Sequence, residues 1–178
     1  MKTSVLILSN NEEIHIERCI KSLLNLKNCD IHVLDSFSID KTEEICHKFE
    51  NVSFYQNKWI NYSQQFNYGL KHFNFKHDWI FRIDADEYLT EELADFINIF
   101  DPKGFNGIII NRRYVFDGKL LNFGGTNPNF HLRLWIRNQG VVEQTWMDER
   151  VILDKPKLYK TKKAIVDENL HGHKKYLV

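Results

Sequence analysis

Short apolar runs alternate with helical stretches up to about residue 100, and this alternation restricts the fold more than any other feature. The runs are rich in β-branched and aromatic residues, which is typical of buried parallel strands. They lie at residues 4–8, 31–34, 52–55 and 79–83. Apolar residues recur at helical spacing near residues 16–24, 42–49, 62–73 and 93–100. This order predicts an α/β fold with an open, mostly parallel sheet and helices on both faces.

The later part of the chain has a different pattern. Three further strand-like runs, "IIINRRYVF", "FHLRLWIR" and "KLYKTKKAIV", are separated by Gly and Asn turns. They predict mixed or antiparallel strands in the C-terminal half. The chain has 178 residues, of which 43% are hydrophobic. This is enough for one sizeable core, so we expect a single domain over residues 1–178.

Charge and cysteine content argue against several classes of protein. Lysine plus arginine (24) equals aspartate plus glutamate (24), so net charge gives no reason to expect a nucleic-acid partner. The three cysteines form no C-x-x-C pair, which predicts reduced thiols in a cytosolic protein. The N-terminal apolar run is too short for a signal peptide, and no segment approaches a membrane span. We therefore expect a soluble chain that is still able to visit a membrane surface.

Polar residues follow three of the predicted parallel strands. The first strand ends in "SNNEE", the second in "DSFSIDKT" and the fourth in "DADE". In open α/β sheets, ligands bind beyond the carboxyl ends of the strands, where helix N-termini and loop amides converge. This edge of the sheet is therefore the predicted binding site.

The segment "WIFRIDADEY" places Asp84, Asp86 and Glu87 directly after an apolar strand. Nearby carboxylates repel one another unless a cation lies between them. Such oxygen ligands suit Mg²⁺ or Mn²⁺, which bind through one or two carboxylates together with substrate phosphates. The alternative interpretation is a solvated turn, with Glu87 complementing the dipole of a helix that begins around Thr90.

Two other positions at this edge, Asp35 and Asn11, also have a structural interpretation. Asp35 directly follows the second strand and is placed either to accept hydrogen bonds from a ribose or a base, or to act as a turn residue. Asn11 lies in the first loop, where Asn10 and Glu13 have the spacing of a helix capping box.

Several motifs follow one another along the chain: "VLILSNNEEIHIERCIKSL", "IHVLDSFSIDKTEEI", "NYSQQFNYGL", "DWIFRIDADEYLTEEL", and "FHLRLWIR" followed by "MDERV". In this order and spacing they resemble the family 2 inverting glycosyltransferases of the GT-A fold, most closely the small bacterial enzymes that add sugars to lipopolysaccharide core or capsule. The resemblance covers nearly the whole chain. It implies transfer of a hexose from a UDP-sugar donor to a glycan or lipid-linked acceptor, with Mn²⁺ or Mg²⁺ as cofactor. Residues 1–100 would bind the nucleotide-sugar and residues 101–178 would form the acceptor side.

The resemblance also implies roles for individual residues. Asp84 and Asp86 match the D-x-D motif, with Asp86 the main metal ligand and Asp84 closer to the ribose. Phe66 replaces a basic residue of the family's Gln-Arg/Lys-Asn stretch, which argues against a direct phosphate contact there. The residues implied to bind uracil, ribose or the rest of the nucleotide are Ser9, Asn11, Glu12, Asp35, Gln65 and Asn67.

Inversion in one displacement requires a carboxylate that takes the proton from the acceptor hydroxyl, opposite the leaving diphosphate. Related sequences carry a His-Glu pair where this chain has Asp148 and Glu149. The resemblance therefore implies Glu149 as the catalytic base, with Asp148 as its substitute. The alternative is an exposed acid pair that balances Arg150 and Arg137.

Arg133 and two C-terminal histidines have open roles. Arg133 alternates with leucines in its strand and points either toward acceptor or phosphate, or toward solvent. The resemblance places His171 and His173 near a position where a histidine sometimes approaches the metal or the diphosphate. Their place at the end of the chain equally favours a disordered tail.

Two other classes of function compete with a glycosyltransferase. A haloacid-dehalogenase-type phosphatase also has an apolar strand before D-x-D, but it needs Thr or Val where Tyr88 stands and places the motif at the first strand. A non-catalytic nucleotide-sugar-binding module is the other alternative. For the enzyme we expect a cytoplasmic location, including peripheral contact with the inner face of the cell membrane.

Overall fold

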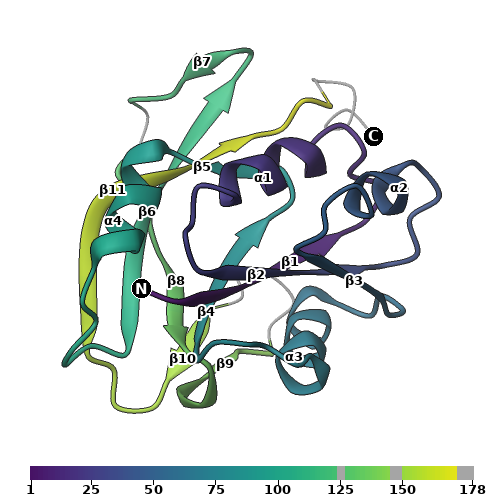
Figure 1. Cartoon of the computed structure of the whole chain (residues 1–178). Coiled ribbons are helices and arrows are strands. Elements are labelled where there is room, and N and C mark those ends of the chain that lie inside the picture. The colour runs from purple at the N-terminus through teal and green to yellow at the C-terminus, as the bar shows by residue number, and fades with distance from the viewer. Residues whose placement is uncertain (124–126, 145–149, 172–178) are drawn as a thin grey trace.

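The computed structural model describes residues 1–123, 127–144 and 150–171, and its centre is a curled sheet with helices on both faces (Figure 1). The strands and helices predicted up to residue 100 are present, with slightly different ends. The strands are β1 (Thr3–Ser9), β2 (Cys29–Asp35), β3 (Val52–Gln56) and β4 (Trp79–Asp84). The helices are α1 (Ile16–Leu23), α2 (Thr42–Cys46), α3 (Tyr62–His72) and α4 (Glu91–Ile99). None of the helices in the described ranges is long and apolar enough to cross a bilayer.

These four strands are parallel. β1 lies between β2 and β4, and β3 pairs with the outer side of β2. In this register Ser9 is opposite Asp35, and Leu8 is opposite Asp84. The polar residues that end the three strands therefore meet at one edge of the sheet, as the sequence predicts.

The remaining strands extend the sheet beyond β4 in mixed directions. They are β5 (Glu87–Leu89), β6 (Gly107–Phe116), β7 (Lys119–Leu120), β8 (Phe130–Ile136) and β11 (Leu158–Glu168). β8 is antiparallel to β4 and β6, β11 is parallel to β6, and β5 is antiparallel to β11. The order is β3-β2-β1-β4-β8-β6-β11-β5, with β7 paired to β6. After β8, the short 3-10 helix η1 (Arg137–Gln139) leads into a separate pair, β9 (Gly140–Val142) and β10 (Val151–Leu153).

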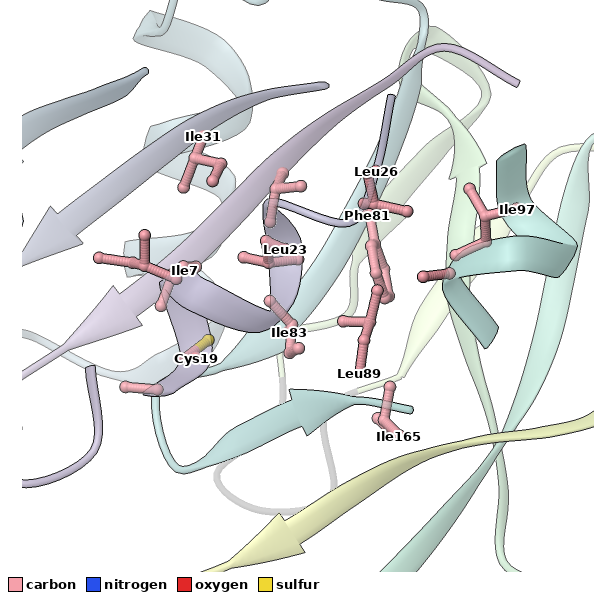
Figure 2. Close-up of a cluster of buried hydrophobic side chains, with 14 of the residues drawn as sticks. Ile7, Cys19, Leu23, Leu26, Ile31, Phe81, Ile83, Leu89, Ile97 and Ile165 are labelled. Carbon is pink, nitrogen blue, oxygen red and sulfur yellow. The ribbon is translucent and has the colours of Figure 1, made fainter. Parts of the chain in front are cut away.

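Two apolar cores lie on opposite faces of the sheet. The larger one contains Ile7, Leu23 and Ile97 and lies under α1, α2 and α4 (Figure 2). The second contains Leu6 and Phe66 and lies between the sheet, α3 and the β9–β10 pair. Neighbouring residues of β1 thus enter different cores, because successive side chains of a strand point to opposite faces. Burial on both faces explains why the parallel strands have continuous apolar runs.

The connection from β4 to β5 forces the sheet to curl. Only Ala85 and Asp86 separate the two strands in the chain. Yet β5 pairs with β11 at the far end of the strand order, so the sheet bends back until its last strand lies beside the end of β4. The curl brings polar side chains of β4, β5, β6, β8 and β11 close to one another.

At the opposite edge, a buried carboxylate joins three segments. Asp30 accepts hydrogen bonds from Ser4 Oγ (2.6 Å), from His32 Nε2 (2.5 Å) and from the Lys76 amide (3.2 Å). Burial opposes ionisation, but the hydrogen bonds from His32, Ser4 and Lys76 outweigh it and lower the pKa of Asp30 to about 2. Asp30 therefore ties β2 to β1 and to the loop that precedes β4.

We expect Asp30→Asn to lower the free energy of unfolding at neutral pH by about 2 kcal/mol, because charge-assisted hydrogen bonds in a buried site are lost. The folded pKa lies below the unfolded value of about 3.9, so the contribution is complete above that value and is lost as the pH falls toward 2. Urea denaturation at several pH values measures both effects. Asp95→Asn, which changes an exposed carboxylate of α4, is the control. Equal stability of the two variants at neutral pH would contradict the role of Asp30.

Candidate functional site

A cavity of about 280 Å³ opens at the carboxyl ends of β1 and β4, and we call it the edge cavity. It brings together four of the residues that the sequence selects: Ser9, Glu12, Asp84 and Asp86. Among the other lining residues are two aromatic side chains and one cation that the sequence did not select for a site, Trp59, Tyr62 and Arg112. The edge cavity therefore combines acids, an aromatic wall and one cation.

Asp35 is fully buried and supports this cavity from behind its wall. Its carboxylate accepts hydrogen bonds from Ser9 Oγ (2.9 Å) and from the Ser38 amide (2.7 Å) and hydroxyl. This is the bonding expected of the turn interpretation. Asp35 holds Ser9 in the cavity wall, and its direct contact with a nucleotide stays a prediction.

Asn11 joins the loop after β1 to the loop after β2. Its backbone has a φ of 56°, a left-handed conformation that asparagine tolerates better than most residues. The Asn11 amide donates to Ser38 Oγ (2.7 Å), and its side-chain oxygen accepts from the Ile39 amide (2.9 Å). The side chain of Asn11 is therefore used to join the two loops, and a nucleotide contact stays a prediction.

The capping box considered for Asn10 and Glu13 is not formed. Glu13 accepts from the Lys41 amide (3.1 Å) instead, and α1 begins after His15 without a side-chain cap. Glu12 accepts from His15 Nδ1 at 2.6 Å. The first loop is thus fixed by contacts with the loop before α2 and by His15, with Glu12 at the cavity wall.

Asp84 is held by cations of the protein itself. Arg133 Nη1 and Nη2 lie 3.4 and 3.5 Å from Asp84 Oδ2, Arg82 Nε lies 3.8 Å from Oδ1, and the Tyr62 hydroxyl donates to Oδ1. Although burial opposes ionisation, Arg133 and Arg82 hold the pKa of Asp84 well below its usual range. Asp84 is therefore ionised, with both of its oxygens already engaged.

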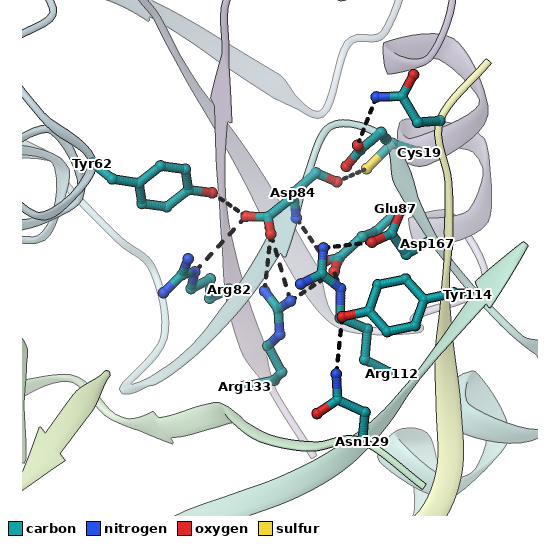
Figure 3. A network of polar contacts seen from close by, with 12 residues as sticks. Cys19, Tyr62, Arg82, Asp84, Glu87, Arg112, Tyr114, Asn129, Arg133 and Asp167 are labelled. Carbon is teal, nitrogen blue, oxygen red and sulfur yellow. Dashed lines mark hydrogen bonds and ion pairs between the residues drawn. The ribbon is translucent and has the colours of Figure 1, made fainter. Parts of the chain in front are cut away.

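Glu87 is fully buried between two arginines (Figure 3). Arg133 Nη2 donates to Glu87 Oε1 (2.6 Å), Arg112 Nε lies 2.9 Å from the same oxygen, and Arg112 Nη2 pairs with Asp167 Oδ2 (2.5 Å). Burial raises the pKa of Glu87, and Arg133 opposes that shift. Together with Asp84, these residues come from five different strands. The solvated-turn interpretation is wrong for Glu87, although Thr90 does cap α4 as expected.

Asp86 has a different environment. Within the described residues no ion pair joins it to a cation. Burial raises the pKa of Asp86 to about 6, and the charges of Asp167, Asp84 and Glu12 add to the shift. A half-buried carboxylate with acids around it and no cation partner is a place where a divalent cation is stabilised. The hard oxygens of Asp86 and Glu12 fit Mg²⁺ or Mn²⁺, whereas Asp84 already has arginine partners.

The segment that follows β11 packs against the first loop. The Leu170 amide donates to His15 Nε2 (2.8 Å), and the rings of His15 and His171 pack edge to face with centroids 4.9 Å apart. Ligand atoms of Glu12, His15 and His171 lie within 4.8 Å of one another. Both ring nitrogens of His15 already have partners, so His15 positions Glu12 and does not serve as a ligand. His171 thus packs beside the edge cavity and not in a detached tail, while His173 lies outside the described residues.

Gln65 and Asn67 do not line the edge cavity. The side chain of Gln65 accepts a hydrogen bond from Asn57 at Oε1 (2.8 Å). Its Nε2 donates to Ser36 Oγ (3.1 Å). Asn67 donates to the Val142 carbonyl (2.7 Å) and accepts from the Val142 amide (3.0 Å). Asn67 therefore fixes β9 to α3, and its place beside the nucleotide stays a prediction. A nucleotide contact of Gln65 stays a prediction.

The predicted base Glu149 and its substitute Asp148 lie outside the described residues. Of their expected partners, Arg137 lies over the Phe75 ring (5.8 Å to the centroid), and Arg150 is exposed. Arg133 is only 3% exposed, which excludes the solvent-facing alternative.

A model of the family described as "Glycosyl transferase family 2" matches residues 4–161. Among curated proteins, an uncharacterized glycosyltransferase of Rickettsia bellii is 38% identical over 94 residues, which are 53% of this chain and 31% of that protein. An uncharacterized glycosyltransferase of Rickettsia typhi is 34% identical over 94 residues, with the same shares of the two chains. The match thus spans about a third of the length of these curated relatives.

Solved structures share the fold at low sequence identity. The structure of S. aureus TarS 1-349 in complex with UDP-GlcNAc has a TM-score of 0.69 and 16% identity, over 100% of this chain and 61% of that chain. The mannosyltransferase PcManGT of Pyrobaculum calidifontis, in complex with GDP-Man and Mn²⁺, has a TM-score of 0.53 and 16% identity, over 63% and 36%. Glucosyl-3-phosphoglycerate synthase of Mycobacterium tuberculosis, with Mn²⁺, UDP and phosphoglyceric acid, has a TM-score of 0.53 and 17% identity, over 77% and 56%. The fold is the GT-A fold that the sequence predicts.

Removing the charge of Glu87 and removing the charge of Asp86 should have different effects on the free energy of unfolding. Glu87→Gln is expected to lower the free energy of unfolding by about 3 kcal/mol or more, because buried Arg133 and half-buried Arg112 lose their shared partner. Asp86→Asn should leave it unchanged or raise it, because removing this charge relieves repulsion from the nearby acids. Urea denaturation of both variants in EDTA tests this. A large loss in Asp86→Asn would show that Asp86 is a structural residue.

Proposed function

Because the chain belongs to glycosyl transferase family 2, we propose that it is a metal-dependent inverting glycosyltransferase that moves a hexose from a UDP-sugar to a glycan or glycolipid acceptor. We place this reaction in cell-envelope polysaccharide synthesis, in the cytoplasm and in peripheral contact with the inner face of the membrane. The family match sets aside the haloacid-dehalogenase alternative, whose motif belongs at a first strand, whereas D-x-D here ends β4.

The observation that carries the proposal is the carboxylate of Asp86 in the edge cavity, which has no ion-pair partner within the described residues and whose raised pKa the charge of Arg112 only partly opposes. Asp84 and Glu87, on either side of it in the chain, have arginine partners, whereas Asp86 has acids around it. A bound Mn²⁺ or Mg²⁺ supplies positive charge for the diphosphate of the donor. The structures with the same fold support this donor class, because they contain UDP-GlcNAc, or GDP-Man with Mn²⁺.

Residues of the chain have distinct tasks in this proposal. Asp86 and Glu12 hold the metal, and Ser9, kept in place by Asp35, contacts the nucleoside. Trp59 lines the same cavity, packs edge to face against Tyr62 and offers an aromatic surface. The nucleotide is thus held between the first loop and the loop before α3.

The transfer itself needs one proton acceptor. A bond forms between the acceptor oxygen and the anomeric carbon, the bond from that carbon to the diphosphate oxygen breaks, and the acceptor proton passes to a carboxylate. We assign that carboxylate to Glu149, with Asp148 as the substitute. Glu149 directly precedes Arg150 in the chain.

Release of UDP from a panel of UDP-sugars with Mn²⁺ tests this function. Because the chain matches about a third of the length of its curated relatives, the non-catalytic binding module remains the competing function. A module binds Mn²⁺ and UDP and releases no UDP from any donor, whereas the enzyme releases UDP from at least one of them.

UDP is expected to raise the melting temperature only when Mn²⁺ or Mg²⁺ is present, because a ligand stabilises the state that binds it. Asp86→Ala should abolish this metal dependence and keep the fold. Differential scanning fluorimetry with Mn²⁺ or with EDTA measures both effects. An equal shift by UDP in EDTA would argue against the metal site, and an Asp86→Ala variant that unfolds would make Asp86 structural.

Glu149→Gln should lower the turnover rate by about 10²-fold or more and leave donor affinity almost unchanged, because a general base acts in the transition state. Initial rates of UDP release and UDP affinity separate the two quantities. Asp148→Asn is the paired variant, and a larger loss in that variant would move the base by one residue. If both variants turn over like the parent protein, neither acid is the base.

A further inference from the structure

A second pocket, of about 580 Å³, adjoins the edge cavity. It lies between β4, β6, β8 and the start of β10, and we call it the arginine pocket. Arg112 lines both pockets, and Asp84 contacts residues of both, Tyr62 of the edge cavity and Arg133 of the arginine pocket. Within the part of the chain that the structure describes, the charged or titratable residues that line the arginine pocket include no carboxylate. They are Arg82, Arg112, Arg133, Arg150 and His131.

The arginines of this pocket differ in how far their charge is compensated. Arg133 and Arg112 pair closely with the carboxylates of Glu87 and Asp167, at 2.5–2.9 Å. Arg82 has a weaker partner, because its Nε lies 3.8 Å from Asp84 and its guanidinium stacks 4.7 Å from the Tyr62 ring centroid. A guanidinium held by an aromatic ring keeps hydrogen-bond donors for a ligand.

Arg150 adds a further positive charge to the lining of the pocket. It is exposed, and no ion pair joins it to any residue of ranges 1–123, 127–144 and 150–171. Among the described residues, four arginines therefore face three carboxylates, those of Asp84, Glu87 and Asp167, which is an excess of positive charge within this part of the chain.

His131 lies in the positive electrostatic field of these arginines. Burial lowers the pKa of His131 to about 4, and Arg133, Arg112 and Arg82 contribute to the shift. Its Nε2 is buried without a hydrogen-bond partner in the described parts of the chain. The pocket thus contains a neutral imidazole with an unused hydrogen-bonding atom beside several guanidinium groups.

We propose that the arginine pocket binds an anionic group, a phosphate or a carboxylate, on the acceptor, so that this chain transfers its sugar to a negatively charged acceptor. The inference rests on the proposed function and names the acceptor class for it. Guanidinium groups match the oxygens of both kinds of anion and bind them in pairs of hydrogen bonds.

The anion is assigned to the acceptor and not to the donor for two reasons. In the proposed function the donor diphosphate binds at the metal held by Asp86 and Glu12, which line the edge cavity and not the arginine pocket. Arg150 also follows the proposed base, Glu149, directly in the chain, and the base must act on the acceptor hydroxyl. An acceptor whose anionic group binds Arg150 is therefore held at the residue next to Glu149, the proposed base that takes the proton of the acceptor hydroxyl.

Calorimetric titration of glucose 6-phosphate, glucuronate and glucose into the protein tests the site, first in EDTA and then with the edge cavity saturated by Mn²⁺ and UDP. We expect at least one charged sugar to bind under both conditions and glucose to bind far more weakly. The phosphate and carboxylate arms show which anion the pocket takes. If UDP competes with the charged sugar, or if glucose binds equally well, the inference is wrong.

Arg150→Gln should weaken binding of the charged sugar about tenfold, because one charge-assisted contact is lost. The exposed position of Arg150 makes a folding defect unexpected, and urea denaturation verifies this. Lys103→Gln removes the same charge from an exposed residue outside the pocket and should leave the affinity unchanged. Equal affinities of Arg150→Gln and the parent protein would overturn the inference.

Turnover then separates this inference from the proposed function. With a donor that supports UDP release, the charged acceptors should give rates about tenfold higher than glucose, and Arg150→Gln should raise the KM for the charged acceptor and leave the KM for the donor unchanged. Equal rates with charged and neutral acceptors contradict the inference alone. Absence of UDP release with every donor contradicts the proposed function.

Discussion

The pairing of Glu87 with Arg133 and Arg112 is the interaction on which the rest of the site depends. A carboxylate taken fully out of water costs several kcal/mol unless opposite charges accompany it, and here one oxygen of Glu87 meets both arginines. The two arginines come from β8 and β6, which pair directly, whereas Glu87 belongs to β5 at the far end of the strand order. The curl brings β5 back beside the end of β4, where Glu87 reaches Arg133 of β8. The ion cluster therefore favours the curled arrangement over a flat one and fixes the β4–β5 turn, which carries Asp86.

This arrangement divides the site into two regions of opposite charge. On one side burial and neighbouring acids raise the pKa of Asp86. On the other side, within the described residues, arginines outnumber the acids that pair with them. Asp84 lies between the two regions, accepting from Tyr62 on one side and from Arg133 on the other. In the proposed function, a nucleotide with its metal and an anionic acceptor occupy these neighbouring regions, whose described lining residues have only Arg112 in common.

The sequence predicts the local elements well and the contacts between distant segments poorly. Apolar periodicity is local, so β1 to β4 and their helices follow from it, as does the polar edge at Ser9, Asp35 and Asp84. The Arg133–Glu87 and Arg112–Asp167 pairs join residues 46 and 55 positions apart, and they depend on register and curl, which local patterns do not specify. Asn67 shows the same limit, because successive helix residues are rotated by about 100°. With Phe66 buried in the core, Gln65 and Asn67 flank it on different sides of α3.

The partial compensation of the arginines also bears on selectivity between the two ligands. Fully unpaired, these guanidinium groups would attract any phosphate strongly, and the diphosphate of the donor would bind there without a metal. Asp84, Glu87 and Asp167 reduce the positive charge to a small excess, so a single anionic group is better matched than a diphosphate. If donor and acceptor bind as proposed, the acids that hold the sheet together also direct the donor to the side of Asp86. Under that proposal, structural stability and the separation of donor from acceptor depend on the same three carboxylates.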